Sequence, residues 1–275
     1  MRITMNHVYN QIVLFGDSIT QDYQRKVDVM NRGFSGYNTN WAIPILKQLL
    51  PTTTAPTCSN ILLLTVFFGA NDAALPGSSQ HVPLSRYVSN LEILASLTQS
   101  PISPYYNPDT RLLFITPPVL DEDTWAERCR REGREPDRLS RVTFEYVRAV
   151  KETGARLGVP VVDVWAAIMK EVDREYDAEE EERKAVVTKV GPQMSLFGER
   201  VKGVNGGRPL SDFLSDGLHL APAGSQVLYR TVQAAIRDHY PDLQPDNLPP
   251  ILPWFREIDP KNYEDSMQFA PLKKN

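Results

Sequence analysis

The feature that most constrains this chain is a short apolar run, Ile12 to Phe15, which stops abruptly at Gly16. Such a run is typical of a strand buried on both faces, as in the middle of a parallel sheet. Gly16 permits the sharp exit that this strand needs. The hydroxyl of Ser18 is then expected just past the carboxyl end of the strand, where open α/β sheets hold their ligands. Gly-Asp-Ser is also a common turn tripeptide, so a purely structural role stays open at this point.

Further strand-like runs follow, and helical patterns separate them. Strands are predicted at Val27 to Arg32, Ile61 to Phe68, Arg111 to Thr116 and Val161 to Val164. Helices are predicted at about Trp41 to Leu50 (capped by Asn38 or Asn40), Pro83 to Thr98, Asp137 to Leu157, Trp165 to Lys170 and Pro222 to Tyr240. This alternation indicates a parallel sheet with helices on both faces, joined by right-handed crossovers. We therefore predict a three-layer α/β/α, flavodoxin-like fold with a parallel five-stranded sheet.

Length and patterning favour one domain over the whole chain, residues 1–275. With 275 residues, 41% of them hydrophobic, the chain can bury a sizeable core, and it shows no internal repeat. We expect a charged and glycine-rich insertion at about 171–210 and a Pro-rich tail at about 241–275. The charge run from Glu171 to Lys184 is most simply a solvated helix face. The aromatic residues of the tail, Trp254 among them, predict that it packs against the body.

Composition excludes several classes of protein. The formal net charge of −4 argues against nucleic acid or an anionic membrane as the main partner. Cys58 and Cys129 lie in unrelated contexts, so neither a disulfide framework nor a metal site is expected. The N-terminal residues lack a long apolar region, and no stretch approaches about 18 uninterrupted apolar residues. We expect a reduced, cytoplasmic protein without stable membrane insertion, and a homo-oligomer is left open.

Residues suited to acyl transfer fall in loops that this fold brings to one edge of the sheet. Ser18, Gly36 and Asn71 follow predicted strands, whereas Asp216 and His219 precede the last helix. A serine hydroxyl is a poor nucleophile unless a base takes its proton, and a histidine held in one tautomer by a carboxylate is the usual solution. The spacing Asp216-x-x-His219 allows both side chains to come from a single turn.

Four sequence blocks make the chain resemble a known family. They are GDSIT from Gly16, NRGFSGYNT from Asn31, GAND from Gly69 and DGLH from Asp216, and Pro117-Pro118 follows the fourth predicted strand. In this order they resemble the SGNH (GDSL-type) hydrolase superfamily, and most of all its isoamyl acetate-hydrolysing esterase branch. The resemblance covers about residues 11–165 and 211–240. Ile19 stands where the family name has leucine, which is an apolar exchange.

The resemblance implies a role for each site residue. Ser18 would be the nucleophile, His219 the general base and Asp216 the residue that orients it. The oxyanion hole would consist of the backbone N–H groups of Ser18 and Gly36 and the side-chain amide of Asn71, with no cofactor or metal. Because Gly36 has no Cβ, an acyl oxygen can approach its N–H closely. Asn71-Asp72 is also compatible with a simple turn, in which Asp72 braces the loop.

The implied function is a serine esterase that hydrolyses short-chain, acetate-type esters through an acyl-enzyme intermediate. Its partner would be a small-molecule ester. The segment from Glu171 to Leu210 is longer and more polar than the family pattern, so we expect it to cover the site and alter substrate choice. Alternatives on the same scaffold are a carbohydrate O-deacetylase or a lysophospholipase. A non-catalytic flavodoxin-like binding module is the alternative of another class, although no GxGxxG or Walker A motif follows the first strand.

Overall fold

A computed structural model describes residues 10–15, 23, 26–54, 60–172, 208–251, 254–262 and 265 of the chain. In this part of the chain five strands form a parallel sheet of order β2-β1-β3-β4-β5. The strands are β1 (Gln11–Phe15), β2 (Asp28–Asn31), β3 (Ile61–Phe67), β4 (Arg111–Ile115) and β5 (Val161–Val162). This order is the flavodoxin-like one, so the predicted fold class is confirmed.

The sheet is buried on both faces, as its continuous apolar runs predict. Successive side chains of a strand point to opposite faces, and here neighbouring residues enter different cores. Leu63 and Leu113 belong to one apolar cluster, whereas Leu64 and Leu112 belong to the other. Val13 of β1 lies opposite Met30 of β2 and Leu64 of β3, so β1 occupies an interior position of the sheet.

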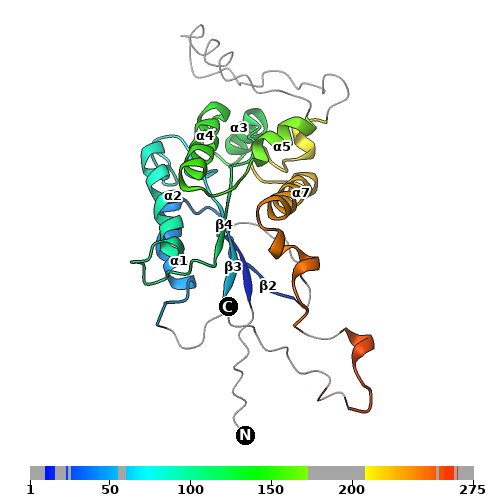
Figure 1. The fold of residues 1–275 in the computed structure, drawn as a ribbon. Helices are drawn as coiled ribbons and strands as arrows, with labels where there is room; N and C mark the ends of the chain where they lie inside the picture. The colour runs from blue at the N-terminus through cyan, green and yellow to red at the C-terminus, as the bar shows by residue number, and fades with distance from the viewer. Residues whose placement is uncertain are drawn as a thin grey trace.

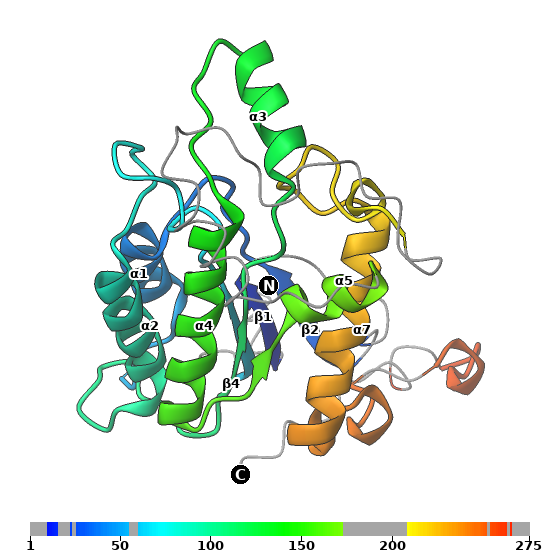
Figure 2. The ribbon, with the colours of Figure 1, turned by 90° about the horizontal axis from the view of Figure 1, so that it is seen from above.

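Helices form a layer on each face of this sheet (Figures 1 and 2). One layer contains α1 (Thr39–Leu49), α2 (Leu84–Gln99) and α4 (Ser140–Leu157), and the other contains α5 (Val164–Glu171) and α7 (Pro222–His239). The side chain of Asn38 caps α1 by accepting from the backbone N–H of Trp41. Because the cap is Asn38 rather than Asn40, α1 begins early enough for Pro44 to lie beyond its first turn.

One helix was not predicted from the sequence. Helix α3 (Glu122–Arg131) lies in the charged segment before α4 and stands apart from both layers in Figure 2. Asp121 caps it, Glu122 and Asp123 occupy its first turn, and arginines occupy its last turn, an arrangement that suits the helix dipole. Its apolar stripe consists mainly of Trp125 and Cys129, too few residues to stand out in so charged a sequence.

Two other features differ from the prediction, and a third cannot be compared with it. The fifth strand is shorter than expected, because Val164 already begins α5 after an N-cap at Asp163. Most of the expected insertion, residues 173–207, lies outside the described residues. In the tail, Leu243 is buried, but Trp254 is 45% exposed, so the expected packing is wrong at that residue. None of the described helices is long and apolar enough to cross a membrane.

Candidate active site

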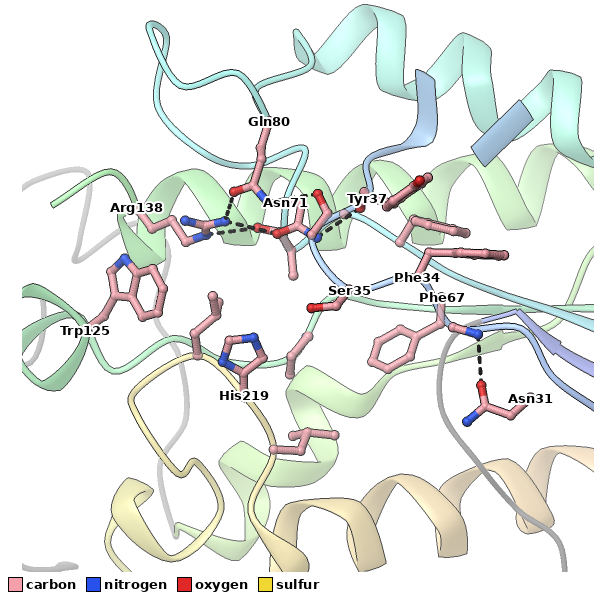
Figure 3. A pocket seen from close by; sticks show the side chains of 18 of the residues that line it. Asn31, Phe34, Ser35, Tyr37, Phe67, Asn71, Gln80, Trp125, Arg138 and His219 are labelled. Atoms are coloured by element: carbon pink, nitrogen blue, oxygen red, sulfur yellow. Dashed lines mark hydrogen bonds between the residues drawn. The ribbon is translucent and has the colours of Figure 1, made fainter. Parts of the chain in front are cut away.

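A cavity of about 560 Å³ opens at the carboxyl edge of the sheet (Figure 3). Its walls come from the loops after β2, β3 and β4, from α3 and from the segment before α7. The lining residues that bear on the chemistry are Phe34, Gly36, Phe67, Asn71, Arg138 and His219. The structure therefore brings Gly36, Asn71 and His219 to one cavity, although up to 183 positions separate them in the sequence.

Asp216 and His219 form a hydrogen-bonded pair within one tight turn. One carboxylate oxygen of Asp216, Oδ1, accepts from the backbone N–H groups of Leu218 and His219 at 3.0 and 2.8 Å. The other, Oδ2, lies 2.7 Å from Nδ1 of the His219 ring. An ionised carboxylate only accepts, so Nδ1 carries the proton and Nε2 is left as the basic nitrogen. The pair therefore has the contact that a general base and its orienting carboxylate require.

The backbone of this turn is held against α3. Gly217 has a φ of +88°, which disfavours other residues, and its carbonyl accepts from the backbone N–H of Asp121 at 2.9 Å. A Cβ at Gly217 would lie 2.6 Å from backbone atoms of Asp121 and Trp125. The ring of Trp125 lies edge-on to that of His219, with 6.4 Å between centroids. The unpredicted helix thus supports the loop that carries His219.

Helix α3 also contributes a charge to the pair. The guanidinium of Arg128 forms an ion pair with Oδ2 of Asp216, the oxygen that contacts His219, and a second one with Glu132 at 2.9 Å. No sequence signal pointed to Arg128, because it is one of several arginines in a charged segment. Its contact favours the ionised form of Asp216, the form that holds the His219 tautomer.

Gly36 lies on the loop after β2 and Asn71 on the loop after β3, the two strands that flank β1. Gly36 has a φ of +80°, so its backbone conformation as well as its missing Cβ favours glycine. The side-chain nitrogen of Asn71 donates to the carbonyl of Tyr37 at 2.9 Å, and its oxygen accepts from Arg138 at 3.0 Å. The loops that carry Gly36 and Asn71, two of the three predicted oxyanion donors, therefore contact each other directly.

Asp72 is fully buried beside Asn71 and ties its loop to the start of α1. Its Oδ1 accepts from the backbone N–H of Thr39 at 3.0 Å and from the hydroxyl of the same residue. Burial raises the pKa of Asp72 to about 6, and the bonds from Thr39 oppose that shift. The expectation that Asp72 braces its loop is confirmed.

Ser18, the predicted nucleophile, lies in residues 16–22, outside the described part of the chain. The strand that leads to it, β1, ends at Phe15 between β2 and β3. Among the described residues, no group of three or more His, Cys, Asp or Glu side chains is placed to hold a metal ion. Trp165 is buried, whereas Trp41 is 40% exposed and lies edge-on to Tyr37.

Comparison with known proteins identifies the family of this chain. Residues 14–183 match the model of the GDSL-like lipase/acylhydrolase family. The chain is 33% identical to an isoamyl acetate-hydrolyzing esterase 1 homolog from Bos taurus, over 91% of this chain and 89% of the relative. It is 26% identical to the isoamyl acetate-hydrolyzing esterase of Saccharomyces cerevisiae, over 91% and 95% of the two chains.

A solved structure shares the fold. The lipase/acylhydrolase from Enterococcus faecalis superposes with a TM-score of 0.51 at 22% identity, covering 88% of this chain and 98% of that protein. The family resemblance drawn from the four sequence blocks is confirmed by the family match and by the bovine relative. The chain belongs to the GDSL-like lipase/acylhydrolase family.

Proposed function

We propose that this protein is a serine esterase in which Ser18 is the nucleophile, His219 the general base and Asp216 its orienting carboxylate. The observation that carries the proposal is the Asp216–His219 pair, whose histidine lines the same cavity as Gly36 and Asn71. A base, its orienter and oxyanion donors facing one space are the components that acyl transfer requires besides a nucleophile. Ser18 follows the interior strand that ends at this edge of the sheet.

The reaction proceeds in two halves. Nε2 of His219 takes the proton of the Ser18 hydroxyl while Oγ of Ser18 bonds to the acyl carbon of the ester. The electron pair of the C=O double bond moves to the ester carbonyl oxygen, which becomes an oxyanion. The N–H groups of Ser18, Gly36 and Asn71 stabilise this oxyanion. When the tetrahedral intermediate collapses, the alcohol leaves with the proton from His219 and an acyl-enzyme remains. Water then attacks the acyl carbon with the same base, releasing the acid and the free serine.

The cavity favours a small neutral ester. Its volume of about 560 Å³ lies within the usual range for small-molecule sites. Phe34, Phe67 and Leu220 supply apolar wall. The two arginines in the lining are paired, Arg134 with Glu132 at 2.5 Å and Arg138 with Asp137 at 2.7 Å, so neither offers an uncompensated cation to an anionic substrate.

Together with the names of the bovine and yeast relatives, this lining supports short acetate esters of medium-sized apolar alcohols as the substrate class. Acid release from isoamyl acetate, acetylated xylose and lysophosphatidylcholine, followed in a pH-stat, tests this choice. We expect the highest kcat/KM with isoamyl acetate. A higher value with the sugar acetate or the lysophospholipid would instead support a carbohydrate O-deacetylase or a lysophospholipase. No hydrolysis of any ester would support a binding module.

The Asn71→Ala variant tests the oxyanion hole. Loss of one oxyanion donor lowers kcat by about 10²- to 10³-fold in enzymes of this type. We expect a loss of that size on p-nitrophenyl acetate, with a far-ultraviolet circular dichroism spectrum like that of the wild type. Unchanged turnover in a folded variant would remove Asn71 from the oxyanion hole.

A further inference from the structure

We propose that Arg138 is a positioning residue that orients the Asn71 amide and, through Gln80, holds the Gly36 loop beside it. This inference rests on the proposed function, in which Asn71 and Gly36 supply oxyanion donors. Arg138 precedes α4 in the chain and is 4% exposed. Figure 3 shows its guanidinium reaching both Asn71 and Gln80 at the wall of the cavity.

The donors of Arg138 are directed to four different acceptors. Nη2 donates to Oδ1 of Asn71 at 3.0 Å and to Oε1 of Gln80 at 2.7 Å. Nη1 donates to Asp137 at 2.7 Å and Nε to the carbonyl of Ala70 at 3.3 Å. The planar fork thus contacts two consecutive residues of the loop after β3, as well as the Gln80 side chain. A lysine, whose three N–H groups radiate from one atom, cannot reproduce this set.

Arginine has no acceptor atom, so it determines which way the two amides face. The atom of Asn71 that meets Arg138 must be the oxygen, which turns the Asn71 nitrogen towards the Tyr37 carbonyl at 2.9 Å. An amide nitrogen carries two hydrogens, so a second N–H remains for a developing oxyanion. A rotated Asn71 amide would place an oxygen there and repel the oxyanion. Donation from a charged guanidinium also polarises the amide, which strengthens its remaining N–H as a donor.

The same reasoning applies to Gln80. With its oxygen facing Arg138, its nitrogen donates to the carbonyl of Gly36 at 2.9 Å. The loop after β2 and the loop after β3 are therefore connected through Asn71 and Tyr37 and through Gln80, which Arg138 orients, and Asn38 also donates to the backbone carbonyl of Gln80 at 3.0 Å. The first connection includes Asn71 and the second includes Gly36, so the separation of these two proposed donors is held by hydrogen bonds.

The guanidinium is itself fixed in place. Its carbon lies 5.0 Å from the centroid of the Trp125 ring, and the indole N–H of Trp125 donates to the same Asp137 oxygen that accepts from Arg138, at 3.0 Å. The backbone carbonyl of Asp137 accepts from Leu75 at 2.7 Å. These contacts restrict the rotamers of Arg138. A residue that orients another side chain must itself be held in one conformation.

A double-mutant cycle of Arg138→Lys and Asn71→Ala on p-nitrophenyl acetate tests the proposal. Misplacement of a catalytic group by about 1 Å can cost about 10²-fold in rate. We expect Arg138→Lys to lower kcat by about 10- to 100-fold with little change in KM, because the oxyanion exists only in the transition state. In the Asn71→Ala background the same change should cost at least about 3-fold less than in the wild-type background, because only the contact with Gly36 through Gln80 is left to lose.

Each other outcome has a separate meaning. An equal loss of kcat in both backgrounds, or wild-type kcat in Arg138→Lys, would overturn the positioning role. Wild-type kcat in Asn71→Ala would instead refute the proposed oxyanion hole. Arg141→Lys changes an exposed arginine in the first turn of α4, three positions after Arg138; it serves as the control and should match the wild type.

If Arg138→Lys does not fold, Gln80→Met tests the Gly36 side of the network. This variant removes both Gln80 contacts from a half-buried position while keeping the side-chain length. We expect kcat to fall by about 3- to 10-fold at unchanged KM, since the side-chain connection to Gly36 is lost. An unchanged kcat would contradict the proposal that Arg138 acts on Gly36 through Gln80.

Discussion

Titration of Asp72 should make the protein less stable as the pH rises from about 4 to 7. Burial raises the pKa of Asp72 in the folded state to about 6 from the ordinary 3.8. Between these values the folded protein holds a proton that the unfolded chain has lost. The stabilisation from that proton is therefore present below about pH 4 and lost as the pH rises through 6. At about 1.4 kcal/mol per pKa unit, the loss amounts to about 3 kcal/mol by about pH 7.

The Asp72→Asn variant isolates this contribution from all other titrating groups. Its Oδ1 keeps the bonds from Thr39, and its amide nitrogen replaces Oδ2, which has no hydrogen-bond partner among the described residues. The asparagine side chain at this position carries no charge at any pH, so any loss of stability from its unpaired nitrogen does not change with pH. We expect the free energy of unfolding in urea, wild type minus variant, to fall by about 2–3 kcal/mol between pH 4 and 7. A difference that stays constant, or that rises with pH, would refute the reasoning.

Two further changes probe the turn that carries the base. Gly217→Ala should lower kcat, and it should lower the free energy of unfolding by about 1–3 kcal/mol. The φ of +88° at this position disfavours any residue with a Cβ, and the nearby backbone of α3 leaves no room for one. Urea unfolding and ester hydrolysis that match the wild type would contradict this prediction. Activity should fall at acid pH as His219 gains a proton, because a protonated ring cannot take the proton of Ser18, and the same limb should persist in Asp72→Asn. A flat pH–rate profile from about pH 5 to 8 would exclude His219 as the base.

The sheet could be predicted because each strand is recognisable from a short run of sequence. Runs such as Ile61 to Phe67 are apolar at every position except Thr65, and a strand buried on both faces favours that composition. The Asp216–His219 pair could be predicted for a similar reason, since three residues of separation allow one turn to bring both side chains together. In both cases the information lies within a short window of sequence.

Helix α3 and the network of Arg138 could not be predicted in this way. The helix has a narrow apolar stripe among many charges, so its periodicity is hidden. Arg138 meets Asn71 and Gln80 across 67 and 58 positions of the chain, and each of the three residue types is common on protein surfaces. Only the packing of α3 and α4 against the loops after β2 and β3 makes these residues neighbours.

Covalent labelling of Ser18 tests the central claim most directly, because that residue lies outside the described part of the chain. A p-nitrophenyl phosphonate ester transfers its phosphonyl group to an activated serine hydroxyl and releases p-nitrophenol. The account predicts one adduct per chain by intact mass spectrometry, located on the peptide that contains Ser18, with loss of p-nitrophenyl acetate hydrolysis. Ser18→Ala should form no adduct and show no hydrolysis while keeping the wild-type circular dichroism spectrum. An adduct on another residue, or hydrolysis that survives in Ser18→Ala, would contradict the account.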